Sequence, residues 1–174
     1  MTEHPSASPP AAAPADGDAA DATDHTAWRA RLLERPSEIA DLLRRVRRIA
    51  VLGIKTADTM QPAHYVPEYA QRAGYEVIPV PVYYPEVTEI LGQPVFRRVA
   101  DVPGGVDMVN VFRRPKDIPA HLDDLLAARP AAVWFQQGIR HDAVAERLAR
   151  AGIAVVQDRC LMVEMRANRV GRTG

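Results

Sequence analysis

The feature that most constrains the fold of this chain is an alternation of short apolar runs and helical patterns that starts near residue 49. The apolar runs are nearly continuous, which is typical of strands buried on both faces of a parallel sheet. They occupy residues 49–53, 75–82, 106–112, 131–135 and 153–156. Between them, apolar residues recur at helical spacing at residues 62–73, 117–129 and 141–151. Strands and helices in this order predict a parallel sheet that helices cover on both faces.

The fold class that follows is α/β, a Rossmann-like doubly wound parallel sheet of five strands with helices on both faces. Right-handed crossovers leave few topologies, and we expect the strand order 3-2-1-4-5, numbered along the chain. Such sheets bind ligands beyond the carboxyl ends of their strands, at the switch point beside the first strand. Functional residues should therefore follow the strand ends at Gly53, Val80, Phe112, Phe135 and Val156.

The length of 174 residues fits one domain. Residues 1–25 are mostly small or polar, and Met1 is their only large apolar residue. Such a segment cannot bury enough apolar surface to offset the entropy of ordering, so we expect a disordered tail. Residues 26–174 then form a single domain, in which residues 26–48 are an N-terminal helical segment. The connection 83–103 is expected to be mainly loop.

Charge and cysteine content limit the partners and the compartment. Lys and Arg (22) balance Asp and Glu (22), so no global basic field exists that would hold nucleic acid or an anionic membrane. No apolar run approaches the roughly 20 residues that span a bilayer, and the N-terminus lacks the features of a signal peptide. The single cysteine, Cys160, excludes a disulfide within the chain, which favours a cytoplasmic location.

The turn after the first predicted strand is the first candidate binding site. Gly53 lets the backbone approach a ligand closely, and Lys55 and Thr56 add a charge and a hydroxyl. The next helix begins near Pro62, a residue favoured in the first helical turn, and its free N–H groups and dipole attract anions. These features suit a pyrophosphate cradle, and they are equally compatible with a plain strand-to-helix turn.

A nicotinamide dinucleotide fits this turn poorly. Its fingerprint requires three glycines, and an acidic residue after the second strand that binds the ribose hydroxyls. The turn offers only Gly53, and the second strand ends at Val80 and Pro81 without an acid. An apolar edge of this kind suits the flank of an adenine ring instead.

Polar side chains follow the third and fourth strands. Arg113 and Arg114 come after Phe112, and guanidinium groups present several donors in a fixed geometry that suits phosphate. An exposed pair at the entry of a helix is the alternative. Gln136 follows the fourth strand, where its amide would hydrogen-bond either a ligand or the local loop.

Two residues carry the hypothesis of an enzyme. Cys160 follows the fifth strand beside Arg159, near a helix start, where thiols are often activated. A free cysteine is more often buried and inert, and no partner histidine is evident from the spacing. His64 lies near the predicted cradle, but a surface position is favoured. The histidines show no metal-binding spacing, so we expect neither a catalytic residue nor a metal site.

Seven stretches of the chain resemble the small single-domain CoA-binding proteins of bacteria and archaea, which are relatives of the CoA-binding domain in the succinyl-CoA synthetase alpha subunit. The stretches occur in order and at the family's spacing, and they are spread along nearly all of residues 49–166. They are IAVLG at 49–53, GYEVIPV at 74–80, EILG at 89–92, VADVP at 99–103, VDMVNVFRR at 106–114, AVWFQQGI at 132–139 and VQDRCLMVE at 156–164.

The resemblance implies a Rossmann-like fold with coenzyme A at the switch point. The phosphates would contact the turn and the following helix start, which are Gly53, Ile54, Lys55 and Thr56, and Pro62, Ala63, His64 and Tyr65. Val80 and Pro81 would flank the adenine. The next stretch of the ligand would be lined by Phe112, Arg113 and Arg114. Two positions depart from the family. Ala63 replaces a common Ser, and residues 81–85 replace a common Val-Asn-Pro.

We therefore predict a protein that binds coenzyme A or an acyl-CoA, its small-molecule partner, as a non-catalytic or regulatory binding protein. We expect a monomer or weak homodimer with no nucleic-acid or membrane partner. One alternative is an enzyme that acts on a CoA ester or nucleotide through Cys160 or His64. A less favoured alternative is an NAD(P)-dependent reductase.

Overall fold

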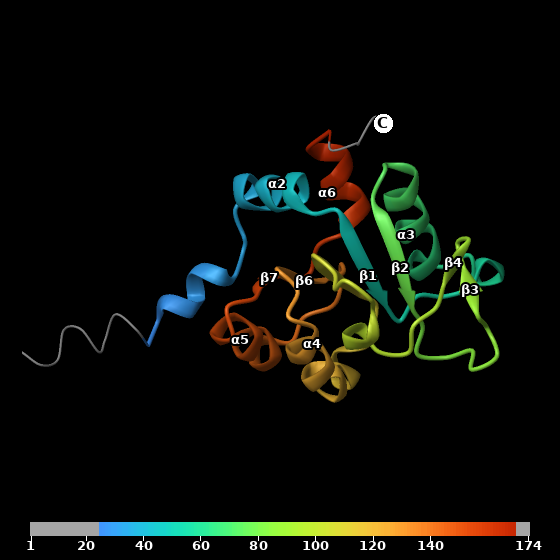
Figure 1. The fold of residues 1–174 in the computed structure, drawn as a ribbon. Helices are drawn as coiled ribbons and strands as arrows, with labels where there is room; N and C mark the ends of the chain where they lie inside the picture. The colour runs from blue at the N-terminus through green and yellow to red at the C-terminus, as the bar shows by residue number, and fades with distance from the viewer. Residues whose placement is uncertain (1–24, 170–174) are drawn as a thin grey trace, which may run out of the picture.

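The computed structural model describes residues 25–169 (Figure 1). The expected disordered tail lies outside the described residues, apart from His25. No helix in the described part is both long enough and apolar enough to cross a bilayer.

The centre of the fold is a five-stranded sheet in which every neighbouring pair is parallel. This confirms the predicted Rossmann-like α/β class. In their order across the sheet, the strands are β2 (Glu76–Val80), β1 (Arg48–Leu52), β5 (Met108–Val111), β6 (Ala132–Phe135) and β7 (Ala154–Val156).

The predicted strand order was wrong in one respect. Counted along the chain, the five strands lie in the order 2-1-3-4-5 instead of 3-2-1-4-5, so β2 is an edge strand. The physical reason is Pro79, which has no N–H to donate and is therefore confined to an edge. The Pro79 carbonyl faces away from β1 and accepts a hydrogen bond from Phe96 N at 2.9 Å. A third strand on this side would have needed the N–H that Pro79 lacks.

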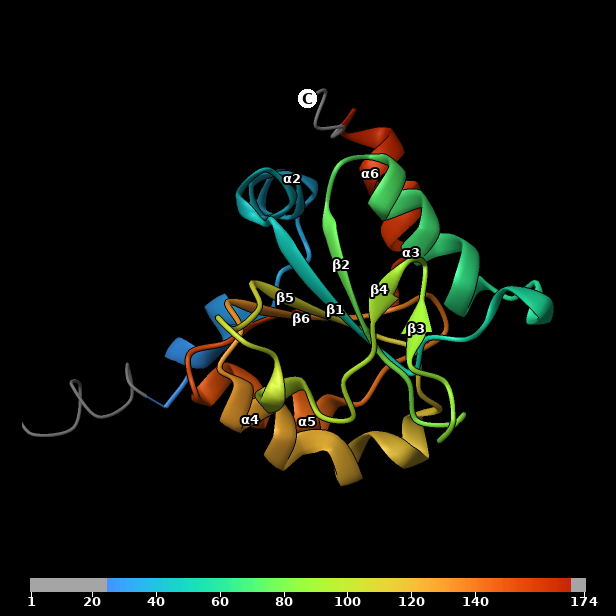
Figure 2. The same ribbon diagram turned by 45° about the vertical axis from the view of Figure 1, so that its right-hand side comes forward.

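A small hairpin lies beside this edge, in the connection that was expected to be mainly loop (Figure 2). Its strands, β3 (Glu89–Ile90) and β4 (Gln93–Pro94), pair antiparallel. The two residues between them, Leu91 and Gly92, both have positive φ, at 54° and 71°. This is the turn geometry that two-residue hairpins favour, although it usually uses Asn-Gly rather than Leu-Gly. The chain then returns through η3 (Val99–Asp101) to β5.

Helices cover both faces of the sheet, each over its own hydrophobic core (Figure 1). On one face lie α2 (Pro36–Arg45), α3 (Pro62–Arg72) and α6 (Leu161–Ala167). On the other lie α4 (Leu122–Ala128) and α5 (Asp142–Arg150), with η4 (Pro115–His121) leading into α4. Short 3-10 turns complete the chain at η1 (Ala27–Arg31) and η2 (Ala57–Thr59).

The N-terminal segment is helical only in part. In place of the expected first helix, the structure has the short 3-10 turn η1. After it, Leu33 N donates to Val155 O at 2.8 Å, and Leu32 forms a parallel bridge with Val155. The chain therefore covers the exposed edge of β7 before α2 begins.

The switch point lies between β1 and β5, at Gly53. This residue has φ 84°, and a Cβ at its position would collide with the backbone carbonyl oxygen of Phe112 and lie 3.1 Å from Arg113 Cδ. The ends of the first and third sheet strands therefore meet at a point where only glycine fits.

We expect Gly53→Ala to destabilise the protein by more than the backbone cost of a left-handed residue, which is about 1–2 kcal/mol. Gly152→Ala is the matched control, because Gly152 has φ 86° and no atom within 4 Å of its would-be Cβ. Urea unfolding measures both. Equal losses for the two variants would show that the Phe112 contact does not constrain the turn.

Candidate functional site

A cleft of about 520 Å³ opens at the carboxyl ends of β1, β5 and β6. Its walls come from the turn after β1, the start of α3, the ends of β5 and β6, and the residue before α6. Many of the predicted contact residues line it, namely Lys55, Pro62, Ala63, Tyr65, Phe112, Arg113, Arg114 and Gln136. Residues that the sequence did not single out also line it, namely Gln61, Val66, Pro115, Gln137, Gly138 and Ile139.

The other predicted contact residues are not among those that line the cleft. Ile54 and Val80 are fully buried, each in the core on its own face of the sheet, and Pro81 is buried as well. Thr56 uses its hydroxyl in a short hydrogen bond to the Asp58 carboxylate. His64 is half-buried in the first turn of α3.

Backbone N–H groups supply less of this site than the turn pattern indicated. Gly53 N donates to Val80 O at 2.9 Å, and Lys55 N donates to Ala63 O at 3.1 Å. These two donors already hold the turn together and are not free for a phosphate. An anion bound at this turn would therefore depend on the other N–H groups and on side chains.

The cationic side chains gather around one aromatic ring. Lys55 Nζ lies 5.7 Å from the ring centroid of Tyr83, and Arg113 Cζ lies 5.6 Å from the same centroid. Lys55 has no carboxylate within ion-pair distance in the part of the chain that the structure describes. Among the described residues, the Lys55 ammonium group therefore has a cation–π contact with the Tyr83 ring and no ion pair.

Arg113 is held in place by neighbours on η4. Its Nε donates to His121 Nε2 at 3.2 Å, and its Nη2 lies 3.7 Å from Asp117 Oδ2. Asp117 is 2.6 Å from Arg114 Nε, and this hydrogen bond lowers the pKa of the Asp117 carboxyl. Burial, and then the charge of Arg113, lower the pKa of His121. A neutral imidazole is required here because His121 Nε2 acts as the acceptor.

A buried amide pair lies beneath the cleft. Gln136 Nε2 donates to Asn110 Oδ1 at 2.8 Å, and Leu161 N donates to Gln136 Oε1 at 3.4 Å. Asn110 is fully buried on β5, and its Nδ2 has no hydrogen-bond partner within residues 25–169. This polar link joins β5, β6 and the first residue of α6.

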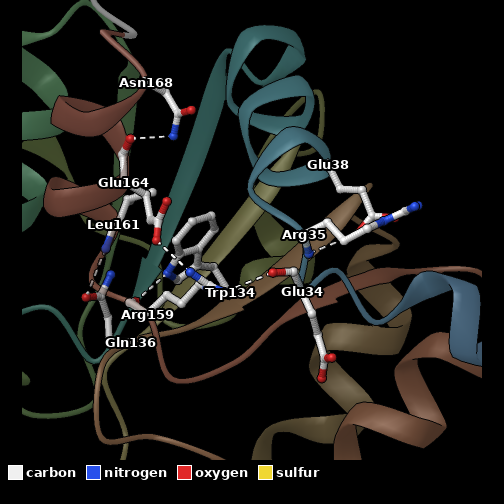
Figure 3. Close-up of polar contacts among 9 residues, drawn as sticks. All are labelled: Glu34, Arg35, Glu38, Trp134, Gln136, Arg159, Leu161, Glu164 and Asn168. Carbon is white, nitrogen blue, oxygen red and sulfur yellow. Dashed lines mark hydrogen bonds and ion pairs between the residues drawn. The ribbon is translucent and has the colours of Figure 1, made fainter.

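Cys160 lines the cleft and immediately precedes α6. The residue before it, Arg159, anchors this segment (Figure 3). Trp134 Nε1 donates to the Arg159 carbonyl at 2.8 Å, and the Arg159 guanidinium donates to Glu164 and to the Glu34 carbonyl, both at 2.9 Å. The guanidinium is therefore engaged with α6 and the N-terminal segment. No hydrogen bond joins the thiol to a histidine among the described residues, and these residues contain no cluster suited to a metal ion.

A second cavity, of about 460 Å³, lies beside the edge strand β7. It is lined by Leu32, Leu33, Glu34, Arg140, Val155, Gln157, Asp158 and Arg159. Its charged groups are largely paired within the protein, since Arg140 contacts Asp142 at 2.9 Å and Arg159 contacts Glu164. The cleft at the switch point is the better candidate site because it holds the unpaired Lys55.

The comparisons with known proteins identify the family. The model of a family described as CoA binding domain matches residues 47–166. The chain belongs to this CoA-binding domain family. A Bacillus subtilis member, the uncharacterized protein YneT, is 34% identical over 133 residues, which are 75% of this chain and 96% of the relative.

Solved structures extend the comparison. A Thermus thermophilus protein titled cell-free ID.343 is 40% identical, with a TM-score of 0.71 over 78% of this chain and 99% of that one. A dinucleotide-forming acetyl-coenzyme A synthetase from Ca. Korarchaeum cryptofilum, in complex with phosphate and ADP, is 20% identical, with a TM-score of 0.56. It covers 67% of this chain and 27% of the synthetase, and at this identity it shows the fold alone. This fold is thus found both as a small protein and as part of a larger chain.

We expect the lowered pKa of His121 to make folding pH-dependent. Below its ordinary pKa of about 6.5 the unfolded chain takes up a proton that the folded protein resists, so stability falls as pH drops from 7.5 to 5.5. His121→Gln should flatten this decline while leaving the stability at pH 8 comparable. Urea unfolding across this range measures the effect, and identical slopes for the two proteins would contradict it.

Proposed function

We propose that this protein binds coenzyme A or an acyl-CoA in the cleft at the switch point, and that it acts as a binding protein rather than as an enzyme. Membership of the CoA-binding domain family gives it a CoA-related role. The observation that carries the finer proposal is the cation group Lys55, Arg113 and Arg114 on the cleft walls. Charged donors in a partly enclosed site are what phosphate recognition requires.

The rest of the cleft fits the remainder of such a ligand. Ala63, Val66 and Ile139 give part of the wall an apolar surface, which suits the aliphatic portion of a pantetheine arm. The amides of Gln136 and Gln137 supply donors and acceptors of the kind that pair with amide groups of a ligand. Coenzyme A, when bound, would supply the thiol that carries an acyl group.

The non-catalytic role rests on the surroundings of Cys160. A nucleophilic thiol needs a base within hydrogen-bond reach, and none contacts Cys160 in the described part of the chain. The enzyme alternative keeps one supporting observation, which is that Cys160 lines the cleft. We place the protein in the cytoplasm as a monomer or weak homodimer, in accord with its single cysteine.

We expect Lys55→Met to weaken CoA binding about tenfold or more, since a hydrogen bond to a charged group contributes roughly 1.5–3 kcal/mol. Lys116→Met is the matched control, because Lys116 is exposed and does not line the cleft. Isothermal titration calorimetry gives both affinities. Equal affinities for wild type and Lys55→Met would place the phosphates elsewhere.

Ligand class and catalysis are separated by a thermal-shift panel. Ligand at about 100 times its Kd stabilises the folded state by roughly 2.7 kcal/mol, so CoA should raise the unfolding temperature while NAD and NADP leave it unchanged. Cys160→Ala should keep the CoA shift. A shift with NAD but none with CoA would refute the proposal, and turnover of an acyl-CoA that Cys160→Ala abolishes would establish the enzyme alternative.

A further inference from the structure

Tyr83 is the one aromatic residue that contacts both Lys55 and Arg113 among the described residues. It lies on the connection after β2, two residues beyond the buried Pro81, and 52% of its surface is exposed. Its hydroxyl is 3.5 Å from Arg113 Nη1, which donates to it. The family pattern did not point to Tyr83, because residues 81–85 depart from that pattern.

The position of Tyr83 is fixed by Arg97 despite its exposure. The Arg97 guanidinium donates to four carbonyls of the same loop, those of Tyr83 at 3.3 Å, Tyr84 at 3.0 Å, Pro85 at 3.1 Å and Val87 at 2.7 Å. Hydrogen bonds from one side chain therefore hold this loop together. The loop backbone is therefore held in place, and the Tyr83 ring lies against Lys55 and Arg113, two residues that line the cleft.

The charge at this end of the cleft is concentrated. Arg113 and Arg114 share one carboxylate, Asp117, whereas Lys55 contacts the Tyr83 ring and no carboxylate within residues 25–169, which leaves two positive charges in this group. A phosphate monoester carries about −1.5 to −2 charges near neutral pH on one phosphorus centre. Each phosphate of a pyrophosphate bridge carries only one. The local charge therefore matches a terminal monoester better than a bridging phosphate.

We propose that Lys55, Arg113 and Tyr83 form a site for a terminal phosphomonoester of the ligand, with the Tyr83 hydroxyl as its third donor. The inference rests on the proposed function, and in coenzyme A this group is the 3′-phosphate. The Tyr83 oxygen accepts from Arg113, so its own O–H is free to donate. Arg113 lowers the pKa of the phenol in the free protein, whereas a bound anion favours the protonated form that donates.

The test compares CoA with dephospho-CoA, which lacks only the 3′-phosphate, on wild type, Tyr83→Phe and the neighbouring control Tyr84→Phe. We expect wild type to prefer CoA, and Tyr83→Phe to weaken CoA binding about tenfold without changing the affinity for dephospho-CoA. Tyr84→Phe should behave as wild type. Unfolding temperatures without ligand establish that each variant is folded.

Several results would overturn the inference. Equal loss for both ligands, or no loss for either, would remove Tyr83 from the monoester site. Equal affinity of wild type for CoA and dephospho-CoA would refute the monoester site while leaving CoA binding intact. Binding of neither ligand would refute the proposed function as well. Inorganic phosphate should compete with CoA but not with dephospho-CoA, and stabilisation by phosphate alone equal to that by CoA would indicate a site for the free ion.

Discussion

The contact between Gly53 and the carbonyl of Phe112 is the constraint on which the rest of the site depends. Because Gly53 has no side chain, the end of β5 can lie directly against the turn that follows β1. This close approach brings Arg113 beside Lys55, although the two residues are far apart in the sequence. The switch point of the sheet is therefore more than a place where two connections diverge. It is where two cations from different strands share one cleft.

The arrangement also changes what the glycine turn contributes to binding. The N–H groups of Gly53 and Lys55 donate to the carbonyls of Val80 and Ala63. They therefore stabilise the turn and are not available to a ligand. In the proposed mode of binding, recognition depends on side chains whose positions other groups fix. His121 and Asp117 hold Arg113, and Arg97 holds the loop of Tyr83.

Apolar periodicity was sufficient to predict the five parallel strands and the helices α2, α3 and α5, because burial on both faces imposes a local pattern. The strand order required attention to Pro79, whose missing N–H marks an edge strand, and the β3–β4 turn used Leu91 where Asn is the usual signal. The cleft residues after β1 and β5 follow from topology. Tyr83 and His121 could not be predicted, because their roles depend on the path of loops that distant contacts set.

The proposed function requires that CoA bind in the switch-point cleft and not in the cavity near β7. Titration of isotopically labelled protein with CoA, followed by amide NMR, tests it most directly. If CoA binds in the cleft, we expect the amide signals of Lys55, Phe112 and Gln137 to shift to saturation, while those of Leu33 and Gln157 stay unchanged. Saturable shifts confined to Leu33 and Gln157, or no shifts at millimolar CoA, would contradict it.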